Sequence, residues 1–325
     1  MTIPTHAAAE RSAAAVPARK KVRPAADRAS EPKKARLRRD LLIGALFLLP
    51  GVLLAVGFKL IPLAGGVSLS LQRTQGFAEP EFAGLANYER MLSDPVVLEA
   101  FRNAIVVTLT LPVWVLLPLV LAVLIHQRTP GWRFFRAAYF LPYTIAPIVV
   151  GIMFRQILAP DGPLNEILRG MGLGALAIEW LNGPVSALFS LVGVALWCFF
   201  GYGVLTYLAG LSTVPAETIE AARIDGAGFW RLLFQIILPL IRGVVGYWTV
   251  LCASGVLIWM FPLIYALTKG GPGNATMLPE FLVFLTTFQF LDRGYGSAIG
   301  IVLFLFVGLI SIFAVRFMYR EGKSA

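Results

Sequence analysis

The sequence predicts an all-α integral membrane protein with six transmembrane helices. Hydrophobic residues make up 58% of the 325-residue chain and charged residues only 14%, whereas a soluble globular protein is about 25% charged. Apolar runs long enough to cross the hydrocarbon core, which takes about 20 residues in a helix, recur along the whole chain. Lysine and arginine residues concentrate in alternate segments between these runs, which is typical of a multi-pass membrane protein.

The predicted spans are separated by shorter polar connections. We expect them at residues 41–63, 104–125, 137–158, 186–211, 244–267 and 298–318. The first run is longer than the apolar core of a cleavable signal peptide, which has about 7–15 residues, so we predict an uncleaved span. Residues 41–320 are therefore expected to form one six-span membrane domain, with a tail at each end (1–40 and 321–325).

The charge distribution predicts the orientation of the chain. Residues 1–40 hold eleven Lys and Arg residues against four acids, residues 73–102 hold three arginines against five acids, and residues 159–183 hold one arginine against three acids. Because basic flanks stay in the cytoplasm, we predict that both termini and the 212–243 loop between spans four and five are cytoplasmic. The N-terminal tail has no apolar periodicity, so we expect it to be disordered and to contact anionic lipid rather than nucleic acid.

Residues able to do chemistry are scarce. His6 and His126 are the only histidines, and Cys198 and Cys252 lie inside predicted spans, where we expect small buried apolar side chains. These four residues provide neither a metal site nor a nucleophile–base pair, so we expect no catalytic residue, no metal, no cofactor and no enzyme activity. Spans two and five contain no acid or base, and span six contains only Arg316, near its C-terminal end. We therefore expect the energy for any transport to come from another chain.

The loop between spans four and five carries the most informative pattern, "EAARIDGAGFWRLLFQIILPLI" (220–241). The preceding Pro215 suits the first turn of a helix that covers "PAETIEAARI" (215–224). Gly226 and Gly228 break this helix because glycine tolerates backbone conformations that other residues resist. A second helix follows, and Pro239 directs the chain towards span five. From the residues alone, a solvated connector and a docking element are equally compatible with this loop.

The spacing in the loop resembles the signature of ATP-binding-cassette importer permeases. That signature is Glu-Ala-Ala, three residues, Gly, nine residues, Ile, one residue and Leu-Pro, here at Glu220, Ala221, Ala222, Gly226, Ile236, Leu238 and Pro239. "FAGLANYERML" (82–92), "FRAAYFLPYTIAPIV" (135–149) and "YALTKGGPGNAT" (265–276) are similar to segments of the carbohydrate-type members, which include the maltose permease subunit. The resemblance implies that the loop forms a coupling helix, which docks in a separate ATPase subunit through the signature residues and Asp225.

The same resemblance suggests a substrate path. Aromatic residues at the end of span four match aromatic positions of the family, and flat aromatic faces suit sugar rings, although packing within the bundle is an equal alternative. Span five departs from the maltose subunit, which has polar amides at the positions of Leu257 and Met260. The expected path comprises Trp197, Phe199, Tyr202, Leu257, Met260 and Tyr265.

By resemblance, the chain is expected to be a permease subunit of an ATP-binding-cassette importer in the bacterial cell membrane. The implied partners are a dimer of ATPase subunits, a second permease subunit of different sequence, an extracytoplasmic solute-binding protein and membrane lipid. The implied cargo is a sugar or oligosaccharide. A glycerol-phosphate diester, a polyamine or a peptide is an alternative cargo, and a membrane channel or scaffold is an alternative function.

Overall fold

A computed structural model of the chain describes residues 33–74, 76, 78–126 and 131–320. The tail predicted at residues 321–325, and most of the tail predicted at residues 1–40, lie outside this range. The chain divides into two compact units, residues 1–62 and 63–325. Four described helices are long and apolar enough to cross a membrane, and the number is six if each of two bent helix pairs counts as one span.

The described residues of the first unit form a single run of helix. Helix α1 (Lys33–Ala55) begins within the predicted tail and continues through the π-helical turn η2 (Val56–Leu60) into α2 (Ile61–Ser70), whose later residues belong to the second unit. The apolar stretch Asp40–Ser70 is 31 residues long. This is more than the roughly 20 residues that a helix needs to cross a bilayer core. This helix contains the first predicted span.

The second unit contains the helices that correspond to the second, fourth and sixth predicted spans. Helices α4 (Pro95–Leu109) and α5 (Leu111–His126) join into one apolar span of 32 residues. Helices α9 (Pro184–Leu211) and α16 (Arg293–Arg320) form the other two. All three are longer than the sequence predicts. The first and last of them carry polar residues at their ends that an apolar window omits, and α9 begins only two residues earlier, at Pro184.

The third predicted span, residues 137–158, is not one helix. Helices α6 (Trp132–Thr144) and α7 (Pro147–Ile157) meet at 101°. The cause is Pro147, which starts α7 and disfavours the helical conformation in the residue before it. Ala146 accordingly has an extended ψ of 130°.

The fifth predicted span, residues 244–267, is also broken. Helix α13 (Arg242–Ile258) ends before Trp259, and a separate helix α14 (Phe261–Leu267) follows, with Pro262 in its first turn. A second bend of 87° precedes α13 and separates it from the segment formed by α11 (Phe229–Arg231), η4 (Leu232–Ile237) and α12 (Leu238–Leu240). This bend lies at Ile241, just after Pro239, as the sequence predicts.

Shorter elements complete the second unit. Strands β1 (Gln72–Arg73) and β2 (Glu81–Phe82) pair antiparallel with Gln72 opposite Phe82. The remaining elements are α3 (Ala86–Ser93), α8 (Pro163–Gly170), η3 (Gly174–Leu176), α10 (Ala216–Ile224), α15 (Pro279–Phe284) and η5 (Leu285–Gln289). The segment α15–η5, which lies between the fifth and sixth predicted spans, is a helix that the sequence analysis does not predict.

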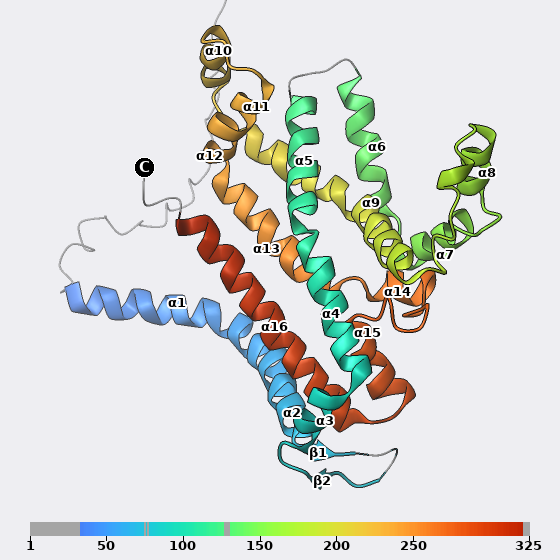
Figure 1. The fold of residues 1–325 in the computed structure, drawn as a ribbon. Coiled ribbons are helices and arrows are strands. Elements are labelled where there is room, and N and C mark those ends of the chain that lie inside the picture. The colour runs from blue at the N-terminus through green and yellow to red at the C-terminus, as the bar shows by residue number, and fades with distance from the viewer. Residues whose placement is uncertain (1–32, 75, 77, 127–130, 321–325) are drawn as a thin grey trace, which may run out of the picture. The chain divides into compact units, whose positions relative to one another are not determined.

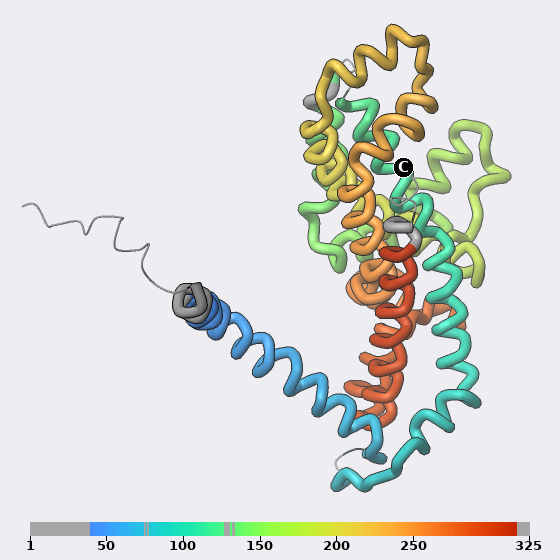
Figure 2. The backbone as a smooth tube through the Cα atoms, turned by 90° about the vertical axis from the view of Figure 1, so that its left-hand side faces the viewer, coloured from blue at the N-terminus to red at the C-terminus, as the bar shows by residue number. Residues whose placement is uncertain are grey.

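The core of the second unit lies where α5, α9 and α13 pack together (Figure 1). Gly203 of α9 allows this close approach, because a Cβ atom there would lie 2.6 Å from Cζ2 of Trp248 and 3.0 Å from Cβ of Pro118. Helix α16 runs along α13, as Figure 2 also shows. Helix α10 belongs to the 212–243 loop, called the coupling loop below. It lies at one end of the unit with the C-terminal end of α5, and α3 with the β1–β2 hairpin lies at the other end (Figure 1).

Candidate functional site

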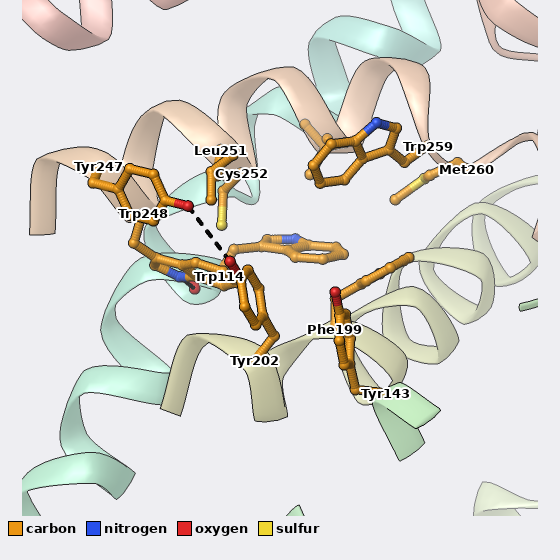
Figure 3. Close-up of a pocket in the computed structure, with 12 residues that line it drawn as sticks. Trp114, Tyr143, Phe199, Tyr202, Tyr247, Trp248, Leu251, Cys252, Trp259 and Met260 are labelled. Carbon is orange, nitrogen blue, oxygen red and sulfur yellow. Dashed lines mark hydrogen bonds between the residues drawn. The ribbon is translucent and has the colours of Figure 1, made fainter. Parts of the chain in front are cut away.

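An aromatic cavity of about 350 Å³ opens between α5, α6, α9 and α13 (Figure 3). Phe199 and Tyr202 of α9 face Trp259 and Met260, which lie at the break between α13 and α14 (Figure 3). The residues that line the cavity are Trp114, Tyr143, Phe199, Tyr202, Tyr247, Trp248, Leu251, Cys252, Gly255, Val256, Trp259 and Met260.

Tyr202 connects the aromatic rings on two sides of the cavity. Its ring stacks on Tyr143 with a centroid distance of 5.0 Å and an interplanar angle of 11°. Its other contact is edge-on to Trp248 at 5.4 Å. The Tyr202 hydroxyl lies 3.4 Å from the Tyr247 hydroxyl (Figure 3). Offset-stacked and edge-to-face pairs of this kind stabilise a fixed ring geometry.

The two buried tryptophans of the cavity are held by hydrogen bonds. Trp248 Nε1 donates to the Trp114 carbonyl oxygen at 2.9 Å, and Trp114 Nε1 donates to Thr110 Oγ1 at 3.0 Å. Because both indole N–H groups are satisfied within the protein, these residues present their ring surfaces to the cavity. The cavity wall is therefore preorganised.

The chemistry of the cavity is that of a binding site. Its lining contains no acid and no base, and its polar groups are tyrosine hydroxyls, the Cys252 thiol and indole N–H groups. Apolar aromatic walls with a few polar groups are typical of sites for uncharged small molecules. Within the described part of the chain, no cluster of three His, Cys, Asp or Glu side chains could hold a metal ion.

The structure places three of the six predicted path residues at the cavity: Phe199, Tyr202 and Met260. The other three lie elsewhere. Trp197 packs on Phe154 of α7 at 5.1 Å between ring centroids, and Leu257 is completely buried on the core side of α13. Tyr265 lies beyond the helix break, 5.9 Å from the ring of Phe261.

The sequence analysis does not identify five aromatic residues of the cavity, which are Trp114, Tyr143, Tyr247, Trp248 and Trp259. They come from three different spans and from a helix break, so no local pattern connects them. The sequence offers one signal for them, which is the aromatic content of the predicted span 244–267: it contains Tyr247, Trp248 and Trp259.

The coupling loop has the helix–break–helix form that the sequence predicts. Pro215 precedes the first helical residue of α10, and Asp225 ends the helix. Gly226 follows with a φ of +77°. The N–H of Ala227 donates to the Ala222 carbonyl at 2.9 Å, and the N–H of Gly226 donates to the Arg223 carbonyl at 3.0 Å. These two bonds form a Schellman motif, whose left-handed position favours glycine.

The signature residues differ in their exposure. Glu220, Ala221, Asp225, Gly226 and Pro239 are exposed, whereas Ile236 and Leu238 are half-buried in the segment that follows. Ala222 is only 7% exposed and belongs to the buried core, which includes Ile219 and Leu232. The Ala222 side chain therefore packs against other residues of the same chain. The exposed surface of α10 is formed by neighbouring residues such as Glu220 and Ala221.

Several exposed apolar residues of this loop lie outside the signature, and two of them are the most exposed. Ile224 at the end of α10 is 86% exposed and Trp230 is 61% exposed. The Trp230 ring stacks on Phe234 at 5.9 Å and lies edge-on to Phe229 at 5.1 Å, so its position is fixed. Large apolar side chains that stay exposed are typical of a surface that contacts a partner or lipid.

Comparison with known proteins shows the family. A family model described as "Binding-protein-dependent transport system inner membrane component" matches residues 82–321. The arabinooligosaccharides transport system permease protein AraP of Bacillus subtilis is 33% identical over 276 residues, which cover 83% of this chain and 87% of AraP. The diacetylchitobiose uptake system permease protein NgcF of Streptomyces coelicolor is 31% identical over 293 residues, 86% of this chain and 83% of NgcF.

Solved structures show the same fold. A bacterial importer of the acidic polysaccharide alginate, in complex with a periplasmic protein that carries an alginate pentasaccharide, contains a chain with a TM-score of 0.75 at 21% identity. The match covers 91% of this chain and all of the other. A second structure of a bacterial alginate importer gives a TM-score of 0.73 at 22% identity. The all-helical permease fold is confirmed.

Proposed function

The chain belongs to the family of inner membrane components of binding-protein-dependent transport systems, and on this basis we propose that it carries a sugar or oligosaccharide through the aromatic cavity. It is a transport component, not an enzyme. The observation that carries the proposal is the uncharged aromatic lining of that cavity. The cargo class has further support from relatives named for arabinooligosaccharides and diacetylchitobiose.

A sugar ring matches this lining in two ways. Its axial C–H groups pack on aromatic faces such as those of Trp114 and Tyr202, and its hydroxyl groups pair with tyrosine hydroxyls. A glycerol-phosphate diester or a polyamine would bring a charge that no lining side chain balances, and transfer of an unpaired charge into a nonpolar site is costly. A neutral saccharide is therefore favoured over these two alternatives.

The energy for transport comes from other subunits in this proposal. A dimer of ATPase subunits docks on the exposed surface of the coupling loop, with Glu220, Ala221 and Ile224 in the contact. A second permease subunit of different sequence completes the translocation path, and an extracytoplasmic binding protein delivers the solute. Both termini and the coupling loop face the cytoplasm, where the basic N-terminal residues contact anionic lipid.

Substitution of Tyr202 tests the path. Tyr202→Ala removes the ring that stacks on Tyr143, and we expect solute uptake to fall about tenfold, since a well-placed aromatic contact contributes about 0.5–1.5 kcal/mol. Tyr202→Phe keeps the ring and should keep most of the uptake. The measurement is uptake of the solute carried by the cognate binding protein, with co-purification of the ATPase as the control for assembly. Unchanged uptake in Tyr202→Ala would mean that this residue serves only packing.

A further inference from the structure

A second cavity of about 350 Å³ lies at the other end of helix α14 from the aromatic cavity. The aromatic cavity reaches Met260, which precedes α14, and the second cavity reaches Leu267 and Thr268, where α14 ends. The seven residues of α14 therefore separate the two cavities, which is about 10 Å of helix at about 1.5 Å per residue. The charged, polar and aromatic residues that line the second cavity, called the polar cavity below, are Arg155, Glu179, Trp180, Asn182 and Thr268.

One wall of the polar cavity is formed where α7 packs closely on α14 (Figure 1). A Cβ atom at Gly151 of α7 would lie 2.7 Å from Cβ of Ala266, so glycine permits this close approach. Arg155 lies four residues after Gly151 in the same helix. Because residues four apart share a helix face, this packing places Arg155 at the cavity, beside the end of α14.

A second wall is the connection between α8 and α9, which is held by the buried side chain of Asn165. Its Nδ2 atom donates to the carbonyl oxygens of Pro160 at 3.1 Å and Ile178 at 3.0 Å, and its Oδ1 atom accepts from Trp180 Nε1 at 2.8 Å. Ser190 Oγ donates to the Trp180 carbonyl oxygen at 3.1 Å. Because its indole N–H group and its carbonyl group are both bound within the protein, Trp180 has a fixed position at the cavity.

The third wall is the segment that follows α14. Thr276 is completely buried, and its Oγ1 atom lies 2.7 Å from Thr268 Oγ1 and 2.8 Å from the Gly271 carbonyl oxygen. Asn103 of α4 donates from Nδ2 to the Asn274 carbonyl oxygen at 2.9 Å. These bonds fix the segment, so the polar cavity is a preorganised site with three walls.

The charged side chains of the polar cavity are not paired with each other. Within the described part of the chain, Arg155 has no hydrogen bond and no ion pair, and the Glu179 carboxylate accepts only from Asn182 Nδ2 at 3.3 Å. Arg90, by contrast, forms an ion pair with Asp292 at 2.8 Å. The guanidinium donors of Arg155 and most lone pairs of Glu179 therefore remain available to a ligand.

We propose that the polar cavity is a second binding subsite, for a neutral saccharide. A saccharide hydroxyl group both donates and accepts hydrogen bonds, so it pairs with the donors of Arg155 and with the acceptors of Glu179. The Trp180 ring provides an apolar contact for the C–H groups of the sugar. A phosphate diester would be repelled by Glu179, and a polyamine would be repelled by Arg155.

The position of this subsite on the solute's route rests on the proposed function, in which the connection between α8 and α9 is extracytoplasmic. The polar cavity is then on the side where the binding protein releases its solute. The aromatic cavity follows at the start of α14. The solute therefore occupies the polar cavity first and the aromatic cavity second.

Two reporter chains test the two cavities separately. Ala159 lines the polar cavity and is half-buried, so Ala159→Cys, combined with Cys198→Ala and Cys252→Ala, reports on that cavity. Native Cys252, in a chain with Cys198→Ala alone, reports on the aromatic cavity. Each chain is assembled with its ATPase and partner permease. The rate of labelling by N-ethylmaleimide is then measured with increasing diacetylchitobiose, arabinotriose, spermidine or glycerophosphoglycerol.

We expect at least one of the two saccharides to slow labelling at position 159. Arg155→Gln should raise the half-protecting concentration of that saccharide about tenfold, because a hydrogen bond to a charged group is lost. Arg155 is exposed and unpaired among the described residues, so this change leaves the packing intact. The matched control is Arg169→Gln in α8, whose guanidinium donates to the Pro160 carbonyl oxygen at 3.3 Å outside the cavity lining. It should leave the half-protecting concentration unchanged.

The outcomes distinguish this subsite from the proposed path. Failure of both saccharides to protect position 159 would overturn the subsite, as would protection by spermidine or glycerophosphoglycerol alone, or equal effects of Arg155→Gln and Arg169→Gln. If a saccharide protects Cys252 but not position 159, the aromatic cavity stands and the second subsite is wrong. If it protects position 159 but not Cys252, the second subsite stands and the proposed role of the aromatic cavity fails.

Discussion

The aromatic cavity and the coupling loop hold their functional residues in opposite ways. The cavity is assembled from four helices, and hydrogen bonds such as that from Trp248 Nε1 to the Trp114 carbonyl fix its rings. The coupling loop is a short helix ended by Gly226, and it presents exposed side chains such as Ile224. Substitutions in the cavity should therefore change solute handling, and those on the loop should change partner binding.

The largest expected effect concerns the loop surface. Ile224→Asp places a charge in the centre of the proposed ATPase contact, where a buried anchor residue contributes about 2 kcal/mol or more. The ATPase should then bind about thirtyfold more weakly. The measurement is ATPase retention on the purified permease in detergent. The control is Ile178→Asp, at another exposed apolar position, in the connection after α8. Equal retention of the ATPase by the two variants would show that Ile224 is not part of the contact.

A smaller effect is expected where the loop packs on its own chain. Ala222→Leu should overpack the buried side of α10 and destabilise the fold by about 1–3 kcal/mol. Ala221→Leu, one residue earlier and exposed, should leave the thermal midpoint of the detergent-solubilised protein unchanged. If Ala221→Leu lowers the midpoint as much as Ala222→Leu does, the assigned orientation of α10 is wrong.

How well the sequence predicts each region depends on whether the residues of that region are close together in the chain. The loop is one contiguous segment, so its helix, its glycine turn and its bend follow from Pro215, Gly226 and Pro239. The burial of Ala222 depends on contact with residues after the break, and the sequence pattern predicts instead that this side chain meets the ATPase. The cavity depends on Trp114 and Tyr143, which become neighbours of α13 only after the spans pack.

The breaks within the third and fifth predicted spans also depend on tertiary packing, which the sequence pattern does not show. A hydropathy window detects apolar length, so it joined α6 to α7 across Pro147 and α13 to α14 across Pro262. Both prolines are visible in the sequence, but proline also occurs inside straight helices of this chain, as Pro118 does in α5. Tertiary packing decides which proline breaks a span.

A pH dependence of stability is expected from Glu280, which lies in the first turn of α15. The pKa of this group is about 8 in the folded protein and about 4.5 ordinarily, and burial is the main cause of the increase. The folded state therefore binds more protons at this group than the unfolded state between these values. The contribution of Glu280 to stability is greatest below pH 4.5 and falls as pH rises to about 8. The slope is at most about 1.4 kcal/mol per pH unit. Thermal midpoints of wild-type and Glu280→Gln protein between pH 5 and pH 8.5 test this, because the variant should lack the slope.

The central claim is that the solute passes through the aromatic cavity, and Cys252 offers the most direct test. This native thiol lines the cavity beside Trp248, and Cys198→Ala leaves it as the single cysteine of the chain. In the assembled importer, labelling of Cys252 by a small thiol reagent is measured during ATP turnover, with the binding protein either loaded with its solute or empty. The account predicts slower labelling with the loaded binding protein. Identical labelling in the two conditions, while the importer is transporting the solute, would contradict it.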